Sequence, residues 1–241
     1  MNIAATQIDA VGDTKITPAD VLGCLNEVEA KNAPSVLYLR GDASLLEHGL
    51  RVSVVGSRKA SAEGLRRAAV LAEALVRHDI TVVSGLAEGI DTAAHRAAIA
   101  AGGRTIAVLG TPLDRAYPKE NAELQAQIGR DHLLVSQFDS VAKTSPKSFP
   151  MRNRTMALLT DATVIVEAGE TSGTVHQGWE ALRLGRVLFL LESVAQDPTL
   201  SWPKEMIAYG AQVLTRENLE AAIEDIPAVT SRSGAELGAL I

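Results

Sequence analysis

Three short turns carry the side chains best suited to chemistry in this sequence. They combine small residues with arginines: Gly56-Ser57-Arg58, then Phe149 with Arg152, Asn153 and Arg154, then Ser172-Gly173-Thr174. A glycine lets the backbone approach a ligand closely, free N–H groups at a helix start attract anions, and arginine offers phosphate a charged fork of donors. We therefore predict phosphate binding at these turns. A plain strand-to-helix turn with Ser61 as N-cap explains the first of them equally well.

The stretch FPMRNR (149–154) lies in a basic segment of an acidic chain. The formal net charge is -6, yet residues 140–160 contain no acid and four basic residues, which are Lys143, Lys147, Arg152 and Arg154. Arginines in the first turns of a helix oppose its dipole, and an anionic ligand would remove that conflict. Phe149, just before this helix, is either a hydrophobic staple onto it or a platform for stacking a base.

A second glycine-rich turn, SGLAEGIDTAAHR (84–96), holds Gly85, Gly89, Asp91 and His95. Asp91 is predicted to be the N-cap of the following helix, and His95 lies four residues on, on the same helical face. The two could begin a metal site, but the sequence offers no third ligand. We favour a structural role, in which a hydrogen bond between the acid and the histidine stiffens the loop.

Composition limits the classes of protein that fit. The single cysteine, Cys24, excludes an intramolecular disulfide, and the pI near 5.4 requires any polyanion to be held in a local groove. The N-terminus lacks a basic region followed by an apolar one, and no apolar run is long enough to cross a bilayer. We expect a cytoplasmic protein without membrane contact, cofactor or metal.

Short apolar runs alternate with helix-period segments, which predicts an α/β fold with a doubly wound, mostly parallel sheet. The expected strands are 52–56, 80–85, 105–110, 132–136, 162–168 and 187–191, and the clearest helices are 61–78, 91–103 and 121–129. Residues 1–34 are expected to form a short helical segment with one helix over 18–30, and 35–39 is a possible extra strand. Residues 35–226 form the main domain, and 227–241 form a tail.

The order of these pieces resembles the DprA/Smf family of bacterial DNA-processing proteins. The matching stretches are VVGSR, SGLAEGIDTAAHR, GGRTIAVLGTPLDRAYPKEN, FPMRNR and SGT, and they run from about Leu37 to Leu191. The resemblance implies an extended Rossmann-like fold that binds single-stranded DNA in a positive pocket without catalysis. It also implies a homodimer that delivers the strand to RecA during natural transformation or recombination.

Carried over by position, the resemblance places the DNA pocket on Gly56, Ser57, Arg58, Phe149, Arg152, Asn153 and Arg154. It makes Gly85, Gly89, Asp91 and His95 the scaffold beside that pocket. Compared with longer family members, residues 1–34 are expected to be too short for the full N-terminal helical domain, and nothing after Ile226 is expected to form their winged helix. A stand-alone domain of this kind also suits a mobile element or a defence system.

Two alternatives stay open. Nucleotide-cleaving phosphoribohydrolases share a glycine-threonine turn followed three residues later by a catalytic glutamate. Gln177 occupies that position here and cannot take up a proton, while Glu180 lies one helical turn further on. The chain could therefore bind or cleave a nucleotide in a signalling or defence system, or serve as an interaction module with a vestigial pocket.

Overall fold

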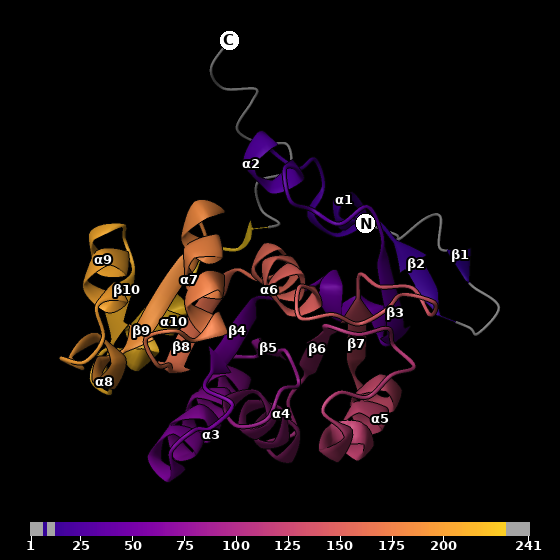
Figure 1. Cartoon of the computed structure of the whole chain (residues 1–241). Coiled ribbons are helices and arrows are strands. Elements are labelled where there is room, and N and C mark those ends of the chain that lie inside the picture. The colour runs from indigo at the N-terminus through magenta and orange to yellow at the C-terminus, as the bar shows by residue number, and fades with distance from the viewer. Residues whose placement is uncertain (1–6, 9–12, 230–241) are drawn as a thin grey trace.

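The computed structural model describes residues 7–8 and 13–229, and a single sheet runs through them (Figure 1). Its strand order is β1-β2-β3-β7-β6-β5-β4-β8-β9-β10. The strands from β7 to β10 in this order are parallel, whereas β3, β2 and β1 are antiparallel to their neighbours. The bounds are β1 (Gln7–Ile8), β2 (Thr14–Ile16), β3 (Leu37–Gly41), β4 (Arg51–Gly56), β5 (Thr81–Ser84), β6 (Thr105–Leu109), β7 (Leu133–Ser136), β8 (Ala162–Glu167), β9 (Val187–Leu191) and β10 (Gln212–Leu214). The prediction of a mostly parallel α/β sheet is confirmed.

Helices cover both faces of the sheet (Figure 1). One face carries α3 (Ala62–Arg77), α4 (Ile90–Ala100), α5 (Ala122–Asp131) and α10 (Leu219–Glu224), and the other carries α6 (Ser148–Leu159), α7 (Gly173–Arg183) and α9 (Trp202–Ala208). Alternate residues of one strand serve the two layers, since Val54 packs with α3 and α4 while Val55 packs with α6. Shorter elements are α1 (Pro18–Leu22), α2 (Glu27–Ala30), α8 (Glu192–Ala195) and the 3-10 turns η1 (Ala43–Leu46) and η2 (Lys119–Asn121).

The side of the sheet on which successive strands are added changes at β4. After β4 it adds β5, β6 and β7 on one side, and it then crosses over to place β8 on the other side of β4. In open α/β sheets, ligands bind at the carboxyl ends of the strands where the order reverses in this way. The fold therefore points to the loops that follow β4 and β8.

The N-terminal segment differs from its prediction. In place of one helix over 18–30 there are two short helices, α1 and α2. Gly23 ends α1 with φ 74°, and Asn26 caps α2 by accepting hydrogen bonds from the N–H groups of Val28 and Glu29. The possible strand at 35–39 is confirmed as β3, and β2 pairs with it. Most of the predicted tail, residues 230–241, lies outside the described residues.

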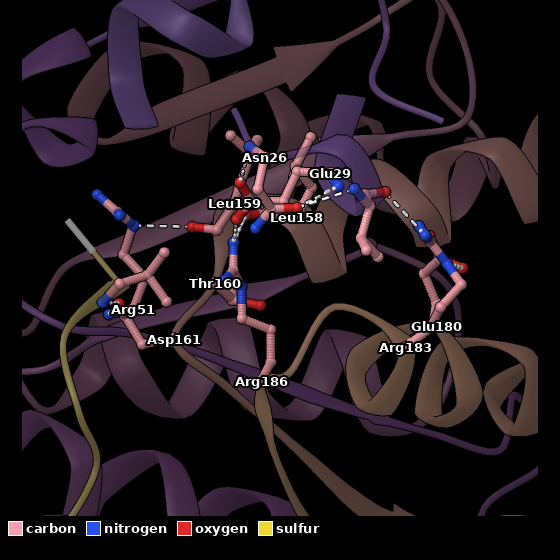
Figure 2. A network of polar contacts seen from close by, with 12 residues as sticks. Asn26, Glu29, Arg51, Leu158, Leu159, Thr160, Asp161, Glu180, Arg183 and Arg186 are labelled. Atoms are coloured by element: carbon pink, nitrogen blue, oxygen red, sulfur yellow. Dashed lines mark hydrogen bonds and ion pairs between the residues drawn. The ribbon is translucent and has the colours of Figure 1, made fainter. Parts of the chain in front are cut away.

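Buried arginines hold the C-terminal end of α6 (Figure 2). Arg186 Nη2 donates to Glu29 Oε1 at 2.7 Å and to the Leu158 carbonyl at 3.3 Å, and Arg51 Nε donates to the Leu159 carbonyl at 2.8 Å. Cations stabilise a helix C-terminus, so both guanidinium groups fix α6 against the sheet, and Glu29 fastens α2 to the same point. Among the described residues, no helix is both long and apolar enough to cross a bilayer.

Candidate nucleic-acid interface

A cleft of about 450 Å³ opens at the carboxyl ends of β4 and β8, between α6 and α7. All the predicted phosphate-binding residues except Arg154 line it: Gly56, Ser57, Arg58, Phe149, Arg152, Asn153, Ser172, Gly173 and Thr174. Arg154 is exposed on α6 and takes no part in this lining. The fold therefore brings three sequence-distant turns to one place, while Arg154, which the resemblance places in the DNA pocket, lies outside this lining.

Arg58 lies exposed at the rim of the cleft. Its Cζ atom is 5.2 Å from the centroid of the Phe149 ring, a cation–π contact that keeps the guanidinium above the opening. No carboxylate within the described ranges pairs with it. The turn beneath is held by Ser57, whose N–H donates to the Glu167 carbonyl at 2.7 Å. Arg58 is thus a positioned cation with its charge available to a ligand.

Arg152 is buried at the base of the cleft. Its Nη1 lies 3.8 Å from Asp91 Oδ2 and donates to the Val108 carbonyl at 3.4 Å. The guanidinium passes over Gly85, where a Cβ atom would come within 1.0 Å of Nη1. Burial lowers the pKa of Arg152, and Asp91 opposes that shift. A Cβ at position 85 would therefore displace the guanidinium of a side chain that lies 67 positions further along the sequence.

Asp91 is not the N-cap that the sequence predicts. Gly89, with φ 76°, holds that position, and a Cβ there would lie 2.3 Å from the Ser57 carbonyl oxygen. The Asp91 carboxylate turns inward, where Oδ2 accepts from the N–H groups of Gly85 at 3.2 Å and Ala87 at 3.3 Å. Burial raises the pKa of Asp91, while Arg152 and these N–H groups oppose the shift. Its role is to bind Arg152 and the loop after β5.

The expected hydrogen bond between Asp91 and His95 is also absent from the part of the chain that the structure describes. His95 Nδ1 bonds to Thr105 Oγ1 at 2.7 Å instead, because the ring points into the layer between α4 and the sheet. Burial lowers the pKa of His95 to about 3, so the ring is neutral near pH 7. The described residues contain no group of three His, Cys, Asp or Glu side chains that could hold a metal ion.

Phe149 lies within the first turn of α6, which begins at Ser148, and not before the helix. The staple interpretation is therefore wrong. The ring packs against Gly110, where a Cβ would lie 2.7 Å from Phe149 Cδ1, and against Tyr117, whose ring centroid is 5.2 Å away. With Arg58 above it, Phe149 forms one side of the cleft mouth.

Hydrogen bonds join the opposite wall to the rest of the site. Ser172 caps α7 by accepting from the N–H of Thr174 at 3.2 Å, so the predicted helix start is confirmed. Thr174 Oγ1 donates to the Gly56 carbonyl, and Asn153 Nδ2 donates to the Gly173 carbonyl, each at 3.2 Å. These bonds tie β4, α6 and α7 together around the cleft.

The position that is glutamate in phosphoribohydrolases is a buried amide here. Gln177 lines the cleft and donates from Nε2 to Ser53 Oγ at 3.2 Å. Glu180 does not line the cleft, and Arg183 binds its carboxylate at 2.5 and 3.0 Å, near the contacts that hold the C-terminal end of α6 (Figure 2). The cleft lining does include the carboxylate of Asp91, which is already paired with Arg152.

Comparisons with known proteins agree on the family to which this chain is similar. A family model described as DNA recombination-mediator protein A matches residues 19–226. The chain belongs to this family. The DNA processing protein DprA of Bacillus subtilis is 34% identical over 194 residues, which cover 80% of this chain and 65% of that protein. The chain spans about half to two thirds of the length of the curated relatives it matches, with 65%, 66% and 51% for three of them.

Solved structures of the DNA recombination-mediator protein A family share the fold. DNA processing protein A from Streptococcus pneumoniae superposes with a TM-score of 0.76 at 34% identity, over 89% of this chain and 74% of that one. The Helicobacter pylori protein, whose structure was reported for its single-stranded DNA binding mode, gives a TM-score of 0.72 at 25% identity. That match covers 87% of this chain and 94% of the other. The resemblance to DprA/Smf and the Rossmann-like fold are thus confirmed.

Proposed function

We propose that this protein binds single-stranded DNA by holding strand phosphates in the cleft, and that it acts in DNA processing, recombination or uptake. The observation that carries the proposal is the cleft at the switch point, where Arg58 stands at the rim over Phe149 and Arg152 lies at the base. The α7 start, at Ser172 to Thr174, adds the positive end of a helix dipole. Family membership and the strand-binding Helicobacter pylori relative support it.

The proposal assigns the strand contacts to the lining residues and leaves Arg154 out. A net charge of -6 repels a polyanion over most of the surface, so the strand binds only where local cations exceed local acids. At the rim these cations are Arg58 and Lys59, and Asp91 below them is neutralised by Arg152. Binding of this kind involves few phosphates.

The proposed role is binding without catalysis. Hydrolysis at the glycosidic bond needs a free carboxylate, and Gln177 and the Arg183-bound Glu180 do not provide one. We propose cytoplasmic action and delivery of the strand to a recombinase of the RecA type. The main domain in this proposal is residues 35–226, with 1–34 and 227–241 as flanking segments.

The affinity for a labelled oligothymidine is expected to fall as salt rises. The logarithm of the association constant should decrease with the logarithm of the salt concentration by about 0.7 for each phosphate neutralised. Two or three rim contacts give a slope of roughly -1.4 to -2.1. Fluorescence anisotropy at several salt concentrations measures this slope. Failure to bind the strand at low salt would remove the proposed function.

We also propose a homodimer, as the family resemblance implies. Sedimentation velocity at micromolar protein concentration is expected to give the mass of two chains. The same run at several concentrations tests for reversible association. A single species with the mass of one 25.4 kDa chain throughout would contradict the dimer and leave the strand-binding cleft unaffected.

A further inference from the structure

The two helices that form walls of the cleft have far ends that take no part in it. α6 and α7 line the cleft with residues of their first turns, such as Asn153 and Gly173. Their last residues, Leu159 and Arg183, do not line it. At 1.5 Å per residue, Arg183 lies roughly 15 Å along the helix from Gly173. A contact at the far ends therefore acts on the cleft only through the two helices.

The short helix α2 joins these far ends. Arg183 donates from Nη1 to the Val28 carbonyl of α2 at 2.8 Å. Arg186, just beyond α7, donates from Nη2 to Glu29 Oε1 of α2 at 2.7 Å and to the Leu158 carbonyl of α6 at 3.3 Å (Figure 2). The helix α2 is thus bound to the far ends of both walls.

Apolar side chains support the same bridge. Leu22 of α1, Leu158 of α6 and Leu184, which follows α7, belong to one buried cluster, and Leu25 packs against it. The helix α2 has four residues, of which Glu29 is buried. Isolated helices of this length are not stable in water, so the helical form of α2 depends on these docked contacts.

Glu29 connects the folding of α2 to the position of Arg186. Its Oε2 accepts from the Asn26 N–H at 3.0 Å, which closes the capping box of α2, while its Oε1 binds Arg186. Nε and Nη1 of Arg186 are buried without an acceptor among the described residues. Burial lowers the pKa of the neighbouring Arg51, Asp161 opposes that shift, and the charge of Arg186 adds to it. Without Glu29, Arg186 would be a buried cation that repels Arg51.

We propose that the docking of α2 on α6 and α7 is coupled to strand binding in the cleft, with Glu29 as the positioning residue. This inference rests on the proposed strand binding. At the cleft end, the walls are joined by the exposed hydrogen bond from Asn153 to the Gly173 carbonyl, so the bridge at the far ends also fixes their spacing. Coupling between two sites is reciprocal. Docked α2 favours the bound strand, and the bound strand favours docked α2.

The test measures amide hydrogen exchange in α2 with and without saturating oligothymidine. The N–H groups of Ala30 and Lys31, which bond to the carbonyls of Asn26 and Glu27, report the opening of α2. Their exchange is expected to slow at least about fivefold with the strand, at the lower end of typical coupling between sites. The control is α10, which packs with α3 and α4 on the opposite face of the sheet. Its exchange should not change.

Glu29→Gln is expected to lower the affinity for oligothymidine by about the same factor, because it removes the charge that holds Arg186 and α2 together. Glu27→Gln is the matched control, since it removes the same charge from an exposed position of the same helix. It should bind the strand as wild type does. The exchange measurement uses wild type, so it tests the coupling even if Glu29→Gln does not fold.

The outcomes separate this inference from the function on which it rests. Strand binding by wild type with unchanged exchange in α2 would overturn the coupling and leave the proposed function intact. Equal slowing in α2 and α10 would also overturn it, because the strand would then only stabilise the fold as a whole. A folded Glu29→Gln protein with wild-type affinity would contradict the role of Glu29. Failure of wild type to bind oligothymidine would remove the proposed function, and the coupling with it.

Discussion

The Gly85→Ala variant is expected to bind single-stranded DNA at least about tenfold more weakly than wild type. The added Cβ would lie 1.0 Å from Arg152 Nη1, so the guanidinium must leave its buried place at the base of the cleft. That movement separates Arg152 from Asp91, whose buried carboxylate then has no cation beside it. Breaking a buried pair in this way lowers the free energy of unfolding by about 3–5 kcal/mol. Anisotropy titration and urea denaturation measure the two effects.

Gly169→Ala is the matched control for this prediction. Gly169 also lines the cleft, but a Cβ there meets no atom within 4 Å. The control should keep both the affinity and the unfolding free energy of wild type. A Gly85→Ala protein that binds oligothymidine as wild type does would show that strand binding does not require Arg152 in its buried position.

The strands could be predicted from the sequence because each is a short, β-branched apolar run that a two-sided parallel sheet requires. The same strand pattern explains why the turns of the candidate site lie together, since the carboxyl ends of parallel strands meet at one edge of a sheet. Gly56-Ser57-Arg58 and Ser172-Gly173-Thr174 lie together for that reason. The helix start at Ser172-Gly173-Thr174 followed from local residue types alone.

Tertiary contacts determine which of these side chains face the cleft, and local sequence patterns do not. Arg152 and Arg154 are two residues apart on α6, so their side chains point roughly 200° apart around the helix, and only one can face the cleft. Nothing local distinguishes them, and the structure buries Arg152 and exposes Arg154. Asp91 likewise has a residue type suited to capping, but its pairing with Arg152 depends on a helix more than fifty residues later in the sequence.

The Arg58→Ala variant is expected to lose about tenfold in affinity for oligothymidine and to show a salt slope smaller by about 0.7. Arg58 is exposed, so its removal takes away the proposed phosphate contact and the cation above Phe149 without opening the core. The unfolding free energy should therefore stay within about 0.5 kcal/mol of wild type. Loss of affinity together with a large loss of stability would point to misfolding and contradict this account.

Arg154→Ala is the control, because it removes the same charge from an exposed position on α6 outside the cleft. The most direct test of strand binding in the cleft is one titration of labelled oligothymidine with wild type, Arg58→Ala and Arg154→Ala at the same low salt concentration. Strand binding in the cleft predicts a large loss of affinity for Arg58→Ala and near wild-type affinity for Arg154→Ala. Equal affinities for all three proteins, or a greater loss for Arg154→Ala, would contradict it.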